Sequence, residues 1–156
     1  MPIKLKSLKP KETDFEPHTL GEHIRKRRLV LTLTQKEVAA QLGVVPWTIL
    51  NWEKGHTQPP MASLPGLARF LGYDPFPQPK TLSQHLLAKR RVMGWTIEEA
   101  AEVIGVDPGS WSKWERGRTI LYSQHRALVA RLLNISADAL DREMVSRWNR
   151  AHECRF

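Results

Sequence analysis

The apolar positions of this 156-residue chain recur at helical spacing and predict two similar sets of helices. In each set, apolar residues three or four apart mark the buried face of a helix, and glycine, asparagine or proline marks its end. Leu20 and Ile24 should point inward from the first helix, whereas the basic residues at 25–28 should point mostly outward. The expected helices cover about 20–30, 35–42, 46–54 and part of 60–71, then 82–92, 97–104, 108–116 and 123–133.

The two sets are copies of each other at a constant offset of 62 residues. Residues 34–55 read TQKEVAAQLGVVPWTILNWEKG, and residues 96–117 read TIEEAAEVIGVDPGSWSKWERG. Between 19–57 and its equivalent, 15 of 39 positions are identical without a gap. An internal repeat of this length predicts two small domains that arose by duplication.

Both copies carry the same signals for helix, short turn and helix. A threonine followed three residues later by glutamate predicts a capping box at the first helix. A glycine then enters the left-handed conformation that ends this helix, and a proline occupies the first turn of the next. These residues are Thr34, Glu37, Gly43 and Pro46 in the first copy, and Thr96, Glu99, Gly105 and Pro108 in the second.

This pattern resembles the Cro and phage-repressor-like (XRE) helix-turn-helix family of DNA-binding proteins. The resemblance implies an all-α fold of two tandem lambda-repressor-like helix-turn-helix bundles, each with four to five helices. The residues that carry it are Thr34, Gln35, Glu37, Ala39, Gly43, Val44, Thr48, Ile49, Trp52, Glu53 and Gly55, with Thr96, Glu99, Ala101, Gly105, Val106, Ser110, Trp114, Glu115 and Gly117 in the second copy.

The repeat and the composition between the copies predict where the domains begin and end. The three prolines and the glycine at the junction favour an extended, fairly stiff linker. The expected parts are a loose basic arm over 1–18, a first domain over 19–72, a linker over 73–80, a second domain over 81–150 with an added C-terminal helix, and a tail over 151–156.

In this family the second helix of the motif lies in the DNA major groove. On the helix over 46–54, Ile49 and Trp52 should face the core, which leaves five residues to face the DNA. The amide of the asparagine can bond adenine, the leucine and tryptophan can meet thymine methyl groups, and the lysine can reach a phosphate. These candidates are Pro46, Trp47, Leu50, Asn51 and Lys54.

The first copy has one further candidate contact, Gln35, and one residue with two possible roles, Trp47. The family commonly places a glutamine such as Gln35 against the phosphate backbone, beside the free N–H groups of a helix start. Trp47 has an alternative role, which is a contact with the neighbouring repeat.

The second copy offers a different candidate face: Pro108, Gly109, Ser112, Lys113 and Arg116. Its lysine and arginine are suited to guanine or phosphate. However, Ile97 replaces the glutamine, and Glu98 and Glu102 add negative charge close to where phosphates would lie. We therefore expect the first copy to be the main reader, and the second to be an auxiliary reader or an interaction module.

The resemblance also implies a structural ion pair in each copy. Arg28, late in the first helix, should bond Glu53, and by the offset Arg90 should bond Glu115. A bidentate pair of this kind ties the first helix of a domain to the end of its recognition helix.

The formal net charge of +8 and a pI near 10 favour a polyanionic partner, most simply double-stranded DNA. The one cysteine, Cys154, allows no internal disulfide, so a cytoplasmic protein is expected. The sequence shows no signal peptide and no membrane span. It also shows no metal-ligand cluster, cofactor motif or catalytic constellation, so we expect no metal, no cofactor and no enzyme activity.

The leading hypothesis is a sequence-specific regulator, a bacterial or phage repressor that occupies its operator. The alternative is a protein-interaction or antitoxin-like adaptor that uses the apolar first reading face and the C-terminal helix. That helix, capped by Ser136, should run over about 137–150 with Leu140, Met144 and Trp148 on one face. This stripe either closes the second bundle or forms a homodimer contact.

Overall fold

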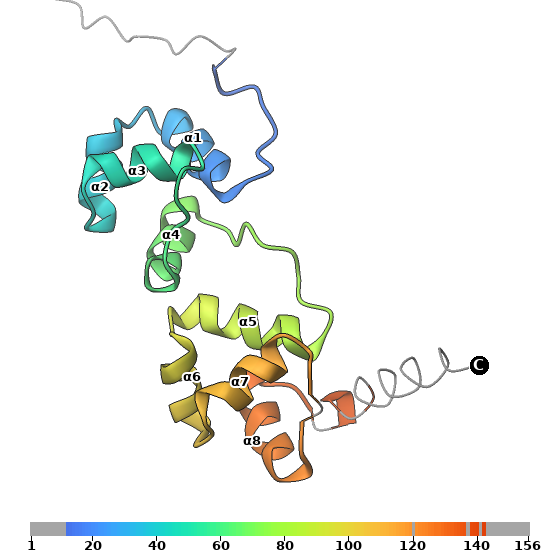
Figure 1. The fold of residues 1–156 in the computed structure, drawn as a ribbon. Coiled ribbons are helices and arrows are strands. Elements are labelled where there is room, and N and C mark those ends of the chain that lie inside the picture. Colours follow the sequence, from blue (N-terminus) through green and yellow to red (C-terminus); the bar gives the residue numbers. More distant parts are fainter. Residues whose placement is uncertain (1–11, 120, 137, 141, 143–156) are drawn as a thin grey trace, which may run out of the picture. The chain divides into compact units, whose positions relative to one another are not determined.

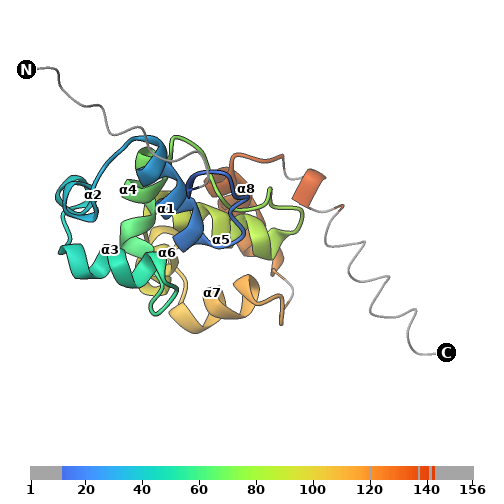
Figure 2. The same cartoon turned by 90° about the horizontal axis from the view of Figure 1, so that it is seen from above.

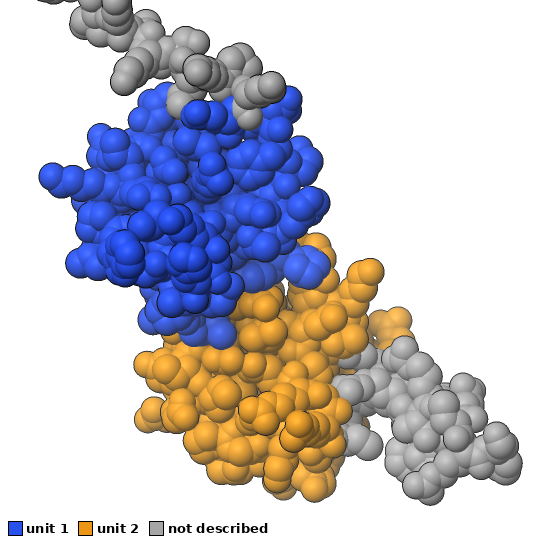
Figure 3. Space-filling model, turned by 45° about the horizontal axis from the view of Figure 1, so that its top comes forward, with its two compact units in different colours: residues 1–77 blue, residues 78–156 orange. Residues whose placement is uncertain are grey.

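The chain folds into two separate units, which divide between Pro77 and Gln78 (Figure 3). The computed structural model describes residues 12–119, 121–136, 138–140 and 142. These residues contain helices and no strand, as the all-α prediction required. This division falls inside 73–80, the segment that the sequence predicts to be a linker.

Unit 1 contains the first helix-turn-helix. Helices α2 and α3 lie side by side, and α1 packs against both α3 and α4 (Figures 1 and 2). The helices are α1 (Leu20–Val30), α2 (Gln35–Leu42), α3 (Pro46–Glu53), the short 3₁₀ helix η2 (Met61–Ser63) and α4 (Leu64–Leu71).

Unit 2 repeats this arrangement. Its helices are α5 (Leu82–Met93), α6 (Ile97–Ile104), α7 (Pro108–Glu115) and α8 (Ser123–Leu133). All of these bounds agree with the sequence prediction to within one or two residues. The Ser136 hydroxyl accepts a hydrogen bond from the Ala139 N–H at the start of the expected last helix, but most of that helix, with Met144 and Trp148, lies outside the described residues.

The helix ends follow the predicted signals. Capping boxes form at both motif helices, and Gly43 and Gly105 both have φ of 68°. Equivalent boxes also form one helix earlier, at Thr19 and Thr81. The ends of these helices are therefore set by local interactions, which are the capping boxes and the left-handed glycines.

Each unit has its own apolar core. Burial of each large side chain in these cores contributes about 1.5 to 3 kcal/mol of transfer free energy. Leu140 belongs to the second core and is fully buried, which favours the bundle-closing role for the start of the last helix. The fully buried large side chains are Ile24, Val38, Ile49, Leu67 and Leu71 in unit 1, and Leu86, Trp111, Leu121, Val129 and Leu140 in unit 2.

The basic run on α1 is less exposed than the sequence suggested. Arg25 is exposed, whereas its three neighbours are half-buried and make contacts within unit 1. Lys26 lies over the Phe15 ring and pairs with Glu16, and the Nε of Arg27 donates to the Phe70 carbonyl at the end of α4. The expectation that 25–28 point mostly outward is therefore wrong for most of the run.

The segments next to unit 1 are also more attached than expected. Phe15 and Glu16 both contact Lys26 on α1, which the prediction of a loose arm did not anticipate, while 1–11 lie outside the described residues. After α4, the Tyr73 hydroxyl hydrogen-bonds His23, and Phe76 packs against the first core. The first half of the predicted linker thus belongs to unit 1.

Thr32, which follows α1, has φ of 57°, a left-handed conformation that a β-branched residue adopts at a cost of about 1 to 2 kcal/mol. Its equivalent is Gly94, with φ of 71°. Replacing Thr32 with glycine is expected to raise the free energy of unfolding of unit 1 by up to about 1 kcal/mol, because the greater entropy of the unfolded glycine offsets part of the relief. Urea unfolding measures this change, and an unchanged or lower midpoint would contradict it.

Candidate nucleic-acid interface

Helix α3 is divided into a buried face and an open face. Ile49 is fully buried and Trp52 is 4% exposed, so both belong to the core. On the other side, Trp47 is 68% exposed, an unusual value for tryptophan in a folded unit of this kind. Of the remaining predicted contact residues, Pro46 and Lys54 are exposed, and Leu50 and Asn51 are half-buried.

Two polar features of this open face are available to a ligand. The Asn51 side chain makes no hydrogen bond to any other part of the chain that the structure describes. The residue before the helix, Val45, gives no side-chain cap to the first N–H groups of α3. Pro46 has no N–H, and the Thr48 N–H donates to the Val45 carbonyl at 2.9 Å, so the start of α3 retains the Trp47 N–H and the favourable helix dipole for an anion.

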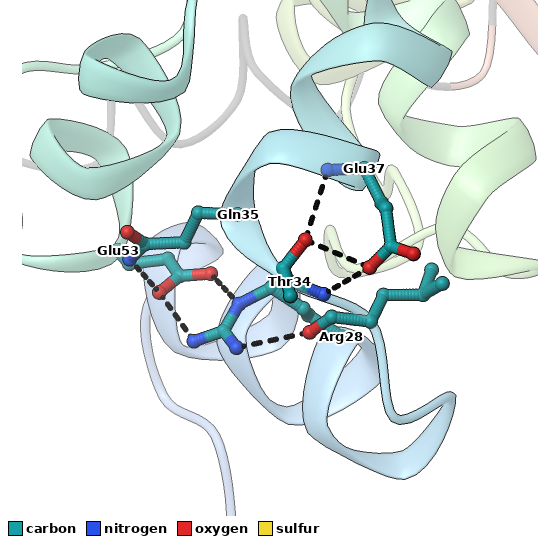
Figure 4. Close-up of polar contacts among 6 residues, drawn as sticks. Arg28, Thr34, Gln35, Glu37 and Glu53 are labelled. Atoms are coloured by element: carbon teal, nitrogen blue, oxygen red, sulfur yellow. Dashed lines mark hydrogen bonds and ion pairs between the residues drawn. The ribbon is translucent and has the colours of Figure 1, made fainter.

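A buried carboxylate network holds α3 in place (Figure 4). Glu53 accepts hydrogen bonds from Arg28 through Nε at 2.6 Å and Nη2 at 2.9 Å, so the predicted ion pair is present and bidentate. Arg28 also donates to the Leu33 carbonyl, which ties the turn after α1 into the network. The Gln35 amide donates to Glu53 Oε2 at 2.9 Å, so this side chain faces α3 in the structure.

Helix α7 presents an open face with different chemistry. Its predicted residues Pro108, Gly109, Lys113 and Arg116 are exposed, and Ser112 is half-buried. Its start is closed by Asp107, whose carboxylate accepts from the Ser110 N–H at 2.9 Å. The Ser110 hydroxyl and backbone hydrogen bonds hold the pKa of Asp107 below its usual range, so a negative charge occupies the place that is open in α3.

Unit 2 has its own carboxylate network. Arg90 bonds Glu115 through Nε and Nη2, both at 2.7 Å, which is the second predicted ion pair. The third donor is the Trp111 indole N–H, at 2.8 Å. Burial alone would raise the pKa of Glu115, but the hydrogen bonds from Arg90 and Trp111 outweigh it and leave this pKa below its ordinary value.

A comparison with known protein families finds the same motif twice in the chain. A family model described as helix-turn-helix matches residues 24–77 and again residues 86–140, which together make up more than half of the chain. The chain belongs to the XRE-type helix-turn-helix family. It is therefore a DNA-binding helix-turn-helix protein with two tandem motifs. Searches of curated proteins and of solved structures each found no match.

The two XRE motifs differ in how they satisfy the same carboxylate. In unit 1 the third donor comes from α2 through Gln35, and in unit 2 it comes from α7 through Trp111. At the equivalent places the chain carries Ile97 and Ile49, which cannot donate from their side chains. Sequence reasoning missed this exchange, although the paired changes at the 62-residue offset were its visible signal.

The described part of the XRE protein contains no group of three or more histidine, cysteine, aspartate or glutamate side chains that could hold a metal ion. None of its helices is long and apolar enough to cross a membrane.

Proposed function

We propose that this XRE protein is a sequence-specific double-stranded DNA-binding regulator, a repressor that acts by occupying its operator. The observation that carries the proposal is the open face of α3, where Trp47 is 68% exposed beside an uncapped helix start. The carboxylate network keeps this helix rigid, which favours defined contacts with base edges.

Four side chains of the α3 face have proposed roles. Asn51 bonds N6 and N7 of an adenine, while Trp47 and Leu50 contact thymine methyl groups in the major groove. Lys54 and the helix start meet phosphates. Gln35 supports this face through its bond to Glu53, and its second amide N–H can still donate to a phosphate.

Unit 2 is proposed to be the weaker reader. The carboxylate of Asp107 covers the start of α7, and Glu98 and Glu102 are exposed on α6. Gly109, in the first turn of α7, also has a lower helix propensity than most other residues. Lys113 and Arg116 remain suited to phosphate or guanine, so α7 contributes auxiliary contacts.

Selection of bound sequences from a random duplex library tests the proposal. The selection is run at about 100 mM salt so that non-specific phosphate binding does not hide base preference. One strongly enriched block supports reading by α3 alone, and a second, weaker block about 34 Å away supports auxiliary reading by α7. A folded protein that enriches no sequence would contradict the proposal.

Asn51→Ala is expected to relax base preference at one position and to weaken binding to the selected site by about 1 to 3 kcal/mol. The reason is that two hydrogen bonds to one adenine are lost while phosphate contacts remain. Titration of the selected duplex and its single-base variants measures both effects. Gln35→Ala serves as the comparison, because it should weaken binding to all these duplexes alike.

The same apolar exposure favours a second candidate, which is a protein-interaction or adaptor module. Val45 and Trp47, 62% and 68% exposed, could bury against a protein partner. Salt separates the two functions, since affinity for DNA falls steeply as salt rises whereas apolar contacts persist.

A further inference from the structure

The open face of α3 is apolar where the helix begins. Val45 is 62% exposed and Trp47 is 68% exposed, and Pro46 between them is also exposed. Leu50, one turn after Trp47, is half-buried. Lys54, the one charged residue among the predicted contacts of this helix, comes only at its C-terminal end. The start of this face therefore offers a ligand mostly apolar surface.

Trp47 has two neighbours on this face, Leu50 and Asn51. Residues three and four apart are adjacent on a helix surface, with Cβ atoms about 5 to 6 Å apart. The side-chain amide of Asn51 makes no hydrogen bond within the described part of the chain. Because stacked base pairs are about 3.4 Å apart, an apolar contact by Trp47 falls within about two base pairs of the base that Asn51 bonds. We call Trp47 and Leu50 the apolar pair.

In a major groove the apolar pair has one kind of partner. The base edges there carry hydrogen-bonding groups, and in unmodified DNA the thymine methyl is the one apolar group among them. The methyl group of 5-methylcytosine occupies the same ring position, although the hydrogen-bonding groups of this base differ from those of thymine. Carbon atoms of Trp47 and Leu50 respond to removal of the methyl from water and not to the neighbouring hydrogen-bonding groups.

Helix α7 lacks the apolar pair, which makes unit 2 an internal comparison. At the 62-residue offset, Gly109 stands in place of Trp47 and Ser112 in place of Leu50. Lys113 likewise stands in place of Asn51. The two units thus share the motif and the buried ion pair, but only unit 1 has a tryptophan and a leucine on the reading face.

We propose that unit 1 reads the methyl group itself, so that DNA carrying 5-methylcytosine is one of its ligands. The apolar pair covers the methyl of a thymine or of a 5-methylcytosine that lies within about two base pairs of the adenine bonded by Asn51. An unmethylated cytosine there leaves the pair partly exposed to water. Methylation of cytosine therefore strengthens sites for unit 1 and not for unit 2. This inference rests on the proposed function, because it requires α3 to lie in the major groove.

Two pairs of duplexes, built on the sequence that unit 1 selects, test the reading of the methyl group. One pair carries thymine or uracil at a single position near the adenine, and the other carries 5-methylcytosine or cytosine at that position opposite guanine. The members of each pair differ in the methyl group alone. Burial of one methyl contributes about 0.8 kcal/mol, so the methylated member should bind about fourfold more tightly.

Three variants assign the effect to the apolar pair. Trp47→Ala should reduce both affinity ratios to below about twofold, because most of the contact with the methyl is lost. Trp47 is 68% exposed, so its replacement should leave the unfolding midpoint unchanged. Asn51→Ala should weaken binding to both members of a pair alike and keep their ratio. Lys113→Ala, at the equivalent place in unit 2, should also keep the ratio.

The outcomes separate this inference from the proposed function. A selected site at which no position near the adenine depends on the methyl, or a ratio that survives Trp47→Ala, would overturn methyl reading while sequence-specific binding stands. A thymine-to-uracil ratio of about four with equal binding of 5-methylcytosine and cytosine would also overturn it, since the pair would then respond to thymine as a whole. A folded chain that selects no sequence overturns both.

Discussion

Unit 1 is expected to lose about 3 to 5 kcal/mol of unfolding free energy when Glu53 is replaced by alanine. The Glu53 side chain is 4% exposed and accepts hydrogen bonds from Arg28 and Gln35. Its removal leaves the Arg28 guanidinium, 14% exposed, without its counter-ion. A buried charge that loses its partner costs more than the pair itself contributes, because neither water nor protein then solvates it fully.

Amide hydrogen exchange measures this loss in each unit separately. Glu53→Ala should reduce protection in unit 1, and Glu115→Ala should reduce it in unit 2. Glu16→Ala is the matched control, since Glu16 is 86% exposed at 3.5 Å from Lys26 and should change stability by less than about 1 kcal/mol. Equal effects of Glu53→Ala and Glu16→Ala would show that burial of the Arg28 to Glu53 pair does not set its contribution to stability.

Most of the fold could be predicted because its signals are local. Capping boxes, left-handed glycines and first-turn prolines act over three to five residues, so the sequence reveals them directly. The ion pair of Arg28 with Glu53 spans two helices, and only the family resemblance made it predictable. Its equivalent, Arg90 with Glu115, then followed from the constant offset.

Features that depend on how the helices cross could not be predicted in this way. The inward turn of Arg27 to the Phe70 carbonyl requires the end of α4 to lie beside α1. The bond of Gln35 to Glu53 likewise depends on the crossing of α2 and α3. For the candidate site, periodicity identified Ile49 and Trp52 as core, but the partial burial of Leu50 and Asn51 depends on how α3 packs. The cap at Asp107 and its absence at Val45 are local features that periodicity does not address.

Gly21→Ala is expected to destabilise unit 1 by about 3 kcal/mol or more, through overpacking against backbone. Gly21 is buried where α1 meets the end of α3, and a Cβ there would lie 2.0 Å from the Trp52 carbonyl oxygen. Because the Glu53 Cα is also only 3.3 Å from that Cβ, no side-chain rotation relieves the overlap. The helices must separate, which would also stretch the Arg28 to Glu53 pair.

Unit 2 provides the comparison for this prediction. Its equivalent residue is Ser83, whose hydroxyl donates to the Trp114 carbonyl at 3.0 Å, so α5 and α7 stand far enough apart for a side chain. Ser83→Ala should therefore cost only about 1 kcal/mol, the value of one hydrogen bond. Gly66→Ala controls for helix propensity in unit 1 and should be neutral or stabilising. If Gly21→Ser were tolerated as well as Ser83 is, the two units would have the same helix spacing, and the close approach of α1 to α3 would not restrict position 21 to glycine.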